Sequence, residues 1–172
     1  MKKKSEIVDV VDKNNKFLYQ IKKEEAHKKG YLHRTIIAEV IDSKGRFILV
    51  KQALNRQDSG QYVSPVGGHI QAGETEEKAL YRETSEEIGL TKFDFKYIGK
   101  AIYNRKVLNR QENHYFILYE IYTDDNPKLN HESISYEKFT KEQLKKELKE
   151  IPKKFGDAYF FVVKTFYPDL IT

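Results

Sequence analysis

The chain has 172 residues, which suits one globular domain, and its apolar and aromatic fractions of 39% and 13% exclude an intrinsically disordered protein. It contains no cysteine, so disulfides, thiolate catalysis and cysteine-based metal sites are excluded. The formal net charge of +5 is a modest excess that suits an anionic small molecule or solubility as well as nucleic acid, and nucleic acid is not the expected substrate.

The sequence gives no sign of a targeting or membrane segment. Residues 5–12 mix charged and apolar side chains, so they provide no apolar core for a signal peptide. No stretch approaches the roughly 20 apolar residues that a membrane-spanning helix needs. We therefore expect a cytoplasmic protein that does not engage a membrane. Because no repeat or composition break interrupts the chain, we expect a single domain over residues 1–172, with residues 1–30 as an N-terminal hairpin extension.

The first half of the chain predicts two β-hairpins, each with two short apolar strands around a cluster of turn-forming residues. The predicted strands cover residues 7–11, 16–21, 35–41 and 46–51. The polar segment 53–61, which carries Gly60, indicates a loop. Residues 62–70 then predict a short strand that Pro65 and the Gly67-Gly68 pair interrupt.

The second half predicts one clear helix, two strands and two further helices. The clear helix covers residues 75–88, where Thr75 can cap the first turn and Gly89 supplies a left-handed stop. The further strands are predicted over residues 93–102 and 114–122, and the further helices over residues 141–149 and 158–166. Strands interleaved with few helices predict a mixed α/β sandwich of the α+β kind, and not a doubly wound fold.

Three glutamates share one face of the predicted helix. At about 100° per residue, Glu83, Glu86 and Glu87 fall within one arc of its surface, where their like charges destabilise an isolated helix. A divalent cation offsets that repulsion, and magnesium takes a few carboxylates together with waters and phosphate oxygens. Upstream, Gly67 and Gly68 let the backbone approach the helix closely, so a glycine carbonyl is a further candidate ligand. The alternative is a solvated acidic helix.

The spacing of the residues around these glutamates decides between the two interpretations. Gly68 is followed after five residues by Glu74, after seven more by Arg82-Glu83, after two more by Glu86-Glu87, and after one more by Gly89-Leu90. This pattern, over residues 68–90, resembles the Nudix box. One position departs from it, because Thr84 stands where that family has an apolar residue, and a threonine methyl can still pack there.

The resemblance implies a Nudix-type α/β/α sandwich and a metal-dependent hydrolase. It implies that magnesium, which manganese can replace, is bound by Gly68 through its carbonyl and by Glu83, Glu86 and Glu87. Glu74 and Arg82 match the pair whose salt bridge braces the loop against the helix, and Gly89 is structural. The implied reaction is that of a pyrophosphatase: water attacks a phosphorus in a nucleoside diphosphate derivative or a similar small phosphorylated metabolite. A carboxylate takes the proton of that water, and Glu83, Glu86 and Glu112 are the candidates.

The similarity extends beyond the box, from about residue 7 to residue 148, and there the chain resembles isopentenyl diphosphate isomerase and its hydrolase-like relatives. Residues 9–12, 25–34 and 50–57 and the Gly67-Gly68-His69 step carry this similarity. The isomerases have a catalytic cysteine where this chain has Gly67, and they degrade the box that is intact here. We therefore expect the hydrolase branch. The alternatives are an isomerase-like enzyme and a non-catalytic Nudix module that binds a nucleotide.

Several side chains outside the box are further candidates. Glu112 lies in a stretch that resembles an acidic metal-binding segment of the isomerases, so it is a candidate distal ligand or general base, or else a surface glutamate. Lys51 and Arg56 are candidates for binding phosphate oxygens of a small-molecule diphosphate substrate, or else solvated charges.

The histidines and the N-terminal hairpin complete the predictions. His27, His33 and His69 show no metal-ligand spacing, so hydrogen-bonding or structural roles are expected for them. The exposed edge of the N-terminal hairpin is a candidate contact for a homodimer.

Overall fold

The computed structural model describes residues 5–172, so Lys2 to Lys4 of the basic N-terminus, which belong to the predicted extension, lie outside the described residues. The strands are β1 (Ile7–Val11), β2 (Phe17–Lys22), β3 (His33–Ile41), β4 (Phe47–Gln52), β5 (Tyr62–Val63), β6 (Val66–His69), β7 (Asp94–Val107), β8 (Arg110–Tyr122) and β9 (Ser133–Phe139). The helices are α1 (Lys23–Lys29), α2 (Glu76–Ile88), α3 (Lys141–Glu150) and α4 (Asp157–Phe166), with short 3-10 turns at Pro152–Lys154 and Pro168–Leu170.

Over residues 5–172 the strands form one mixed sheet centred on β3. This strand runs parallel to β8 from the pair His33↔His114 to the pair Ile41↔Tyr122, and antiparallel to β1, β4 and β6. The path β2-β1-β3-β4-β5 is extended by β7 beside β8 and by β9 beside β4. The parallel β3–β8 register brings the N-terminal ends of two strands that lie far apart in the sequence to the same place.

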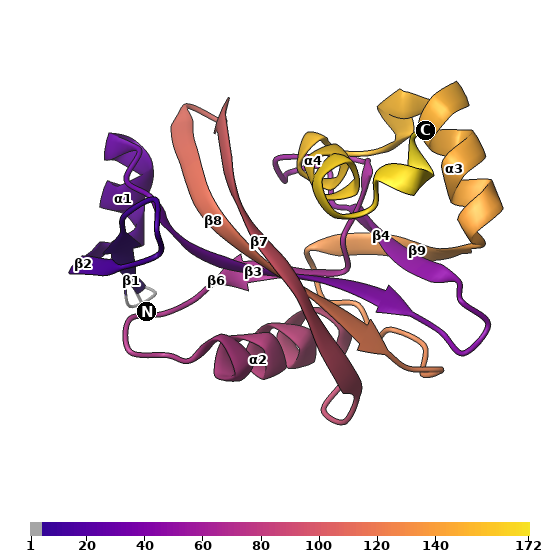
Figure 1. Cartoon of the computed structure of the whole chain (residues 1–172), viewed down its shortest axis with the longest axis horizontal. Helices are drawn as coiled ribbons and strands as arrows, with labels where there is room; N and C mark the ends of the chain where they lie inside the picture. The colour runs from indigo at the N-terminus through magenta and orange to yellow at the C-terminus, as the bar shows by residue number, and fades with distance from the viewer. Residues whose placement is uncertain (1–4) are drawn as a thin grey trace.

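Helices cover both faces of the sheet, which gives the layers of a sandwich (Figure 1). α2 packs on one face through Ile36 and Ala38 of β3 and the buried residues around them. α4 packs on the other face against Ile37 of β3 and Phe116 of β8, and α3 lies beyond it over β9. Alternate residues of β3 therefore face opposite helices, as strand geometry requires. The predicted fold class, a mixed α/β/α sandwich, is confirmed.

Local signals place α2 where the sequence predicts it. The Thr75 hydroxyl accepts a hydrogen bond from the backbone N–H of Lys78 at 3.2 Å, and Gly89 ends the helix with a φ of 69°. Its sheet-facing stripe is fully buried and consists of Ala79, Leu80, Thr84 and Ile88. Each large apolar side chain of this kind stabilises the fold by roughly 1.5–3 kcal/mol, so the stripe fixes which face of α2 turns outward.

Four elements differ from the sequence prediction. β7 and β8 are longer than predicted, because Leu108 and Asn109 both adopt positive φ and form a tight two-residue turn without glycine. β9 and α1 were not predicted. β9 is recruited by pairing with β4, and α1 is a seven-residue helix that ends at Gly30 in a left-handed conformation.

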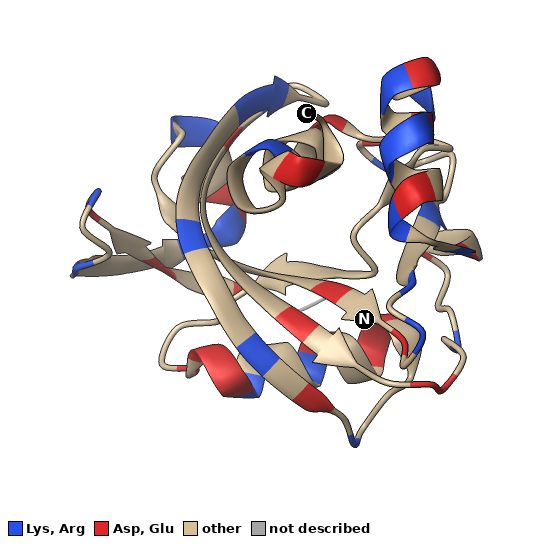
Figure 2. Ribbon diagram, turned by 45° about the vertical axis from the view of Figure 1, so that its right-hand side comes forward, with Lys and Arg blue, Asp and Glu red and all other residues tan. Residues whose placement is uncertain are grey.

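The surface carries charges of both signs (Figure 2), and bands of lysine and glutamate alternate along α3. The outer strand β2 exposes Phe17, Leu18 and Tyr19, the hairpin surface for which a homodimer contact is predicted. Among the described helices none combines the length and the apolar character needed to cross a membrane.

Candidate functional site

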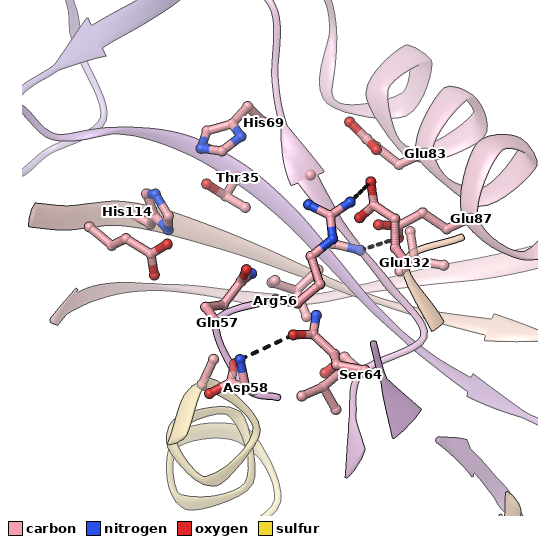
Figure 3. Close-up of a pocket in the computed structure, with 18 of the residues that line it drawn as sticks. Thr35, Arg56, Gln57, Asp58, Ser64, His69, Glu83, Glu87, His114 and Glu132 are labelled. Carbon is pink, nitrogen blue, oxygen red and sulfur yellow. Dashed lines mark hydrogen bonds and ion pairs between the residues drawn. The ribbon is translucent and has the colours of Figure 1, made fainter. Parts of the chain in front are cut away.

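A cavity of about 370 Å³ lies where β6, the C-terminal half of α2, the loop 53–61, β8 and α4 meet. One part of its lining is acidic and belongs to α2, with Glu83, Glu86 and Glu87. Another part carries His69 and His114 (Figure 3), and Ala158 and Val162 of α4 also line the cavity. The cavity thus brings together the predicted metal-binding face of α2 and a group of histidines for which no metal role was predicted.

Gly68 lies in direct contact with Glu83, and this contact explains the glycine. A Cβ atom added at Gly68 would be 2.0 Å from the Glu83 carboxyl carbon and 2.1 and 2.3 Å from its oxygens. The neighbouring backbone N–H of Gly67 donates a hydrogen bond of 2.7 Å to Glu87. Strand β6 and helix α2 are therefore joined through two carboxylates of the predicted metal site.

Arg82 connects the loop, the strand and the helix. It makes a bidentate ion pair with Glu74, with both N···O distances at 2.8 Å, and it donates to the backbone carbonyl of His69 at 3.0 Å. It also contacts Glu83 at 2.5 Å and Glu86 at 3.8 Å. The Glu74–Arg82 pair is present with the geometry that the sequence predicts, and Arg82 additionally orients one carboxylate of the cavity.

Two of the carboxylates of α2 that line the cavity, those of Glu83 and Glu87, have a raised pKa. Burial raises the pKa of Glu83 to about 7, and the Arg82 guanidinium opposes that shift. Burial also raises the pKa of Glu87 well above its usual range, against the hydrogen bond from Gly67. Clustered carboxylates that bear a desolvation cost are the donor set that a hard divalent cation favours, because its charge compensates theirs. Glu83, Glu86 and Glu87 therefore fit a magnesium or manganese ion.

Of the two predicted phosphate-binding residues, Arg56 lines the cavity and Lys51 does not. Arg56 lines the cavity and forms an ion pair with Glu132 (Figure 3). Lys51 is not among the lining residues, although its neighbours Val50 and Gln52 are. Because successive side chains of a strand point to opposite faces, the face of β4 that meets the cavity excludes Lys51. We therefore leave Lys51 out of the proposed site.

Glu112 is buried in the cavity wall, but both of its oxygens are engaged. Arg105 donates to one oxygen at 2.8 Å and Arg110 donates to the other at 2.6 Å. Arg105 in turn makes a bidentate pair with Asp58, at 2.8 and 3.1 Å. This network gives each oxygen of Glu112 an arginine partner, so a role as a base or a metal ligand would require Glu112 to exchange or share one of these contacts.

Four histidines from four elements converge beside Glu112: His27 of α1, His33 of β3, His69 of β6 and His114 of β8. One ring nitrogen from each lies within 4.8 Å of the others. The Nε2 atom of His27 lies 3.3, 3.3 and 3.2 Å from the Nε2 atoms of the other three. One imidazole nitrogen makes a single hydrogen bond, so these three contacts cannot all be hydrogen bonds. Their length matches the spacing of about 3.3 Å between nitrogens that each bind one zinc-like ion at roughly 2.0–2.1 Å.

The hydrogen bonding and the lowered pKa values of these histidines favour the binding of a cation. The Nδ1 atom of His33 donates to the Tyr31 carbonyl at 2.7 Å, which leaves its Nε2 lone pair free to bind. Burial lowers the pKa of His27 to about 4 and lowers the pKa of His69 and His114 well below the usual range, so these rings are neutral at pH 7. Neutral imidazoles suit zinc, copper, iron or nickel. The sequence does not indicate this cluster, because its four members come from four different elements and no two of them have a ligand spacing along one element.

Comparisons with known proteins match this architecture. The sequence pattern of the NUDIX domain matches residues 31–159. The chain is 33% identical over 116 residues to isopentenyl-diphosphate Delta-isomerase 2 of Photorhabdus laumondii, a match that covers 65% of this chain and 66% of that protein. It is 32% identical over 104 residues to an uncharacterised Nudix hydrolase of Streptomyces coelicolor, which covers 57% and 58% respectively. The chain thus matches about three fifths to two thirds of the length of these relatives. The crystal structure of DR0079 from Deinococcus radiodurans has a similar fold, with a TM-score of 0.74, 21% identity, and coverage of 94% of this chain and 99% of that one.

Proposed function

The chain belongs to the Nudix family, whose members generally use divalent metal ions, and on that premise we propose that it is a metal-dependent pyrophosphohydrolase. The proposed substrate is a small phosphorylated metabolite with a diphosphate linkage, such as a nucleoside diphosphate derivative. The proposed reaction is attack of water on one phosphorus of that linkage.

One observation carries the proposal: three carboxylates of one helix line the cavity, and one of them, that of Glu83, packs against a backbone position that only glycine can occupy. Glu83 is 8% exposed and its carboxyl group occupies the space of a Gly68 side chain. A binding module has no need to keep a carboxylate such as that of Glu83 buried at a cost in desolvation, with two further glutamates lining the same cavity. A metal site for an anionic substrate does, because the bound cation compensates the carboxylates and shields the diphosphate.

Each residue of the site has a role in this reaction. Glu83, Glu86 and Glu87, with the Gly68 carbonyl, would hold the magnesium or manganese ion, which when bound polarises the diphosphate and acidifies water. Glu86 is the proposed general base. Its only ion pair among the described residues is the 3.8 Å contact with Arg82, whereas Glu112 is held by two arginines. Arg56, at the loop side of the cavity, is proposed to bind a phosphate oxygen in exchange for Glu132.

The histidine cluster belongs to the same cavity, so we include it in the proposal as a second cation site. His27, His33, His69 and His114 would hold a transition metal there. With one cation on each side of the cavity, each cation would compensate part of the negative charge of a bound diphosphate. Two such sites suit a compact group that carries several negative charges. The protein would then have two metal sites of different preference: the carboxylates for magnesium or manganese, and the histidines for a transition metal.

The names of relatives favour an isomerase as the second candidate. That activity interconverts isopentenyl and dimethylallyl diphosphates and leaves the diphosphate intact. The position of the cysteine of the isomerases is Gly67 in this chain, so a principal catalytic group of that reaction is missing. The intact carboxylate set on α2 further supports the hydrolase.

A phosphate-release assay tests the proposal. Nucleoside triphosphates, nucleotide sugars, dinucleotide cofactors and prenyl diphosphates are each incubated with the protein in magnesium, in manganese and in chelator. The proposal predicts metal-dependent turnover of one of these classes. Ligand binding without turnover in any metal would favour the non-catalytic module, and exchange between the two five-carbon diphosphates without phosphate release would favour the isomerase.

A further inference from the structure

Thr35 of β3 faces the cavity in the same row as His33 and Ile37. Its cross-strand neighbours are His69 on β6 and Phe116 on β8, and both line the cavity with it. Figure 3 shows its side chain between His69 and His114. Thr35 is therefore placed to touch whatever occupies the space beside the histidine cluster.

The Thr35 hydroxyl has no hydrogen-bond partner among the described residues, although the residue is only 5% exposed. A buried hydroxyl without a partner destabilises a fold, and most buried polar side chains are satisfied. Valine has nearly the same shape and an equal preference for strands, so packing alone does not require a hydroxyl here. The free donor instead points to a ligand that enters the cavity.

The charge of the surroundings identifies that ligand as an anion. Lys23, Arg105 and Arg110 line the cavity, and the two arginines pair with the Glu112 carboxylate on the same wall. A divalent cation held by the four imidazoles would add two positive charges there, because no carboxylate belongs to that ligand set. The oxygen atoms of an anionic substrate are drawn to it, and Thr35 lies beside it.

We propose that Thr35 is a substrate-binding residue whose hydroxyl donates a hydrogen bond to a non-bridging oxygen of the bound diphosphate. This inference rests on the proposed function and assigns a contact that the Nudix box does not include. One hydrogen bond to a charged acceptor corresponds to about a tenfold change in affinity.

Thr84 provides a matched control. Its hydroxyl is also buried and without a partner among residues 5–172, at 0% exposure. It lies on the face of α2 that packs on the sheet and does not line the cavity. The Thr35→Val and Thr84→Val variants thus make the same chemical change, one facing the proposed ligand and one facing the core. Thr35→Ser keeps the hydroxyl and serves as the rescue variant.

Two measurements on the full chain test the inference. In thermal denaturation of the metal-free protein, neither valine variant is expected to lower the melting temperature, because no native hydrogen bond is lost. In calorimetry with methylenediphosphonate, a diphosphate analogue that is not cleaved, and with magnesium and cobalt present, Thr35→Val is expected to bind about tenfold more weakly than the parent. Thr84→Val and Thr35→Ser are expected to bind within about twofold of the parent.

The outcomes separate this inference from the proposed function. Binding by Thr35→Val as tight as that by Thr84→Val would overturn the role of Thr35 and leave the hydrolase proposal in place. A melting temperature lowered by Thr35→Val alone would also overturn it, because the hydroxyl would then be a structural group. Failure of the parent itself to bind the diphosphonate or to release phosphate from any diphosphate would contradict the proposed function.

Discussion

Replacement of Gly68 by alanine should abolish the metal site while leaving the fold intact. The new Cβ atom would lie 2.0 Å from the carboxyl carbon of Glu83, whereas ordinary van der Waals contact begins at 3.4 Å. The carboxylate must therefore move by about 1.4 Å, the difference between 3.4 and 2.0 Å. Metal–ligand distances tolerate only about 0.2 Å, so Glu83 would leave the coordination sphere.

The cost to stability should be small compared with the loss of function. The atoms that meet the new methyl group are the free end of the Glu83 side chain, which can rotate, and overpacking of this kind costs about 1–3 kcal/mol. We expect the affinity for manganese to fall by at least about 100-fold, because the loss of a partner that only orients a metal ligand already costs up to that much. Metal-dependent turnover should fall by at least as much.

The adjacent glycine offers the control. A Cβ at Gly67 would meet the side-chain end of Ile37 at 3.3 Å, and Gly67 has no positive φ, so Gly67→Ala should fit with a minor adjustment. Manganese binding is measured by electron paramagnetic resonance, which requires no knowledge of the substrate. If Gly68→Ala bound manganese as tightly as Gly67→Ala, the assignment of Glu83 as a metal ligand would be refuted.

Three further predictions follow from the same geometry. Glu86→Gln should lower turnover by at least about 100-fold with an unchanged circular dichroism spectrum, and near-normal activity would contradict the metal-site assignment. His27→Ala should remove one equivalent of bound cobalt per chain, measured by the cobalt absorption spectrum, and an unchanged stoichiometry would exclude the histidine site. Burial raises the pKa of Glu39 from 4.5 to about 7, so the folded state retains a proton that the unfolded state has lost. The free energy of unfolding should therefore fall by on the order of 3 kcal/mol as pH rises from about 4.5 to 7. Glu39→Gln removes this group, so it should raise the melting temperature more at pH 8 than at pH 5. Equal changes in melting temperature at the two pH values would contradict this burial cost.

The parts of the fold that depend on local chemistry could be predicted from the sequence. The cap at Thr75, the apolar stripe through Leu80 and Ile88, and the stop at Gly89 all lie within one helix, so α2 and its acidic face were predictable. The hairpins around Asp42 and Asp12 were predictable for the same reason, since their side chains accept hydrogen bonds from the turn backbone.

Features that depend on tertiary pairing could not be predicted. Ser133–Phe139 becomes a strand because β4 offers an edge for it, and the long β7–β8 hairpin turns at residues without glycine. The histidine cluster depends on the parallel register that aligns His33 with His114, and no spacing along the chain encodes it. The orientation of Lys51 depends on which face of β4 meets the cavity. The carboxylates of the site could therefore be predicted from the sequence. The histidine cluster and the side chains that line the rest of the cavity could not.

The most direct test of the proposed function is hydrolysis of the preferred diphosphate in water enriched in oxygen-18, followed by phosphorus NMR of the products. Attack of water on phosphorus predicts one oxygen-18 atom in a phosphate product, in the presence of magnesium, and none in chelator or with Glu86→Gln. A product without label, or a substrate whose double bond has moved while its diphosphate remains intact, would contradict the proposal that this protein is a hydrolase.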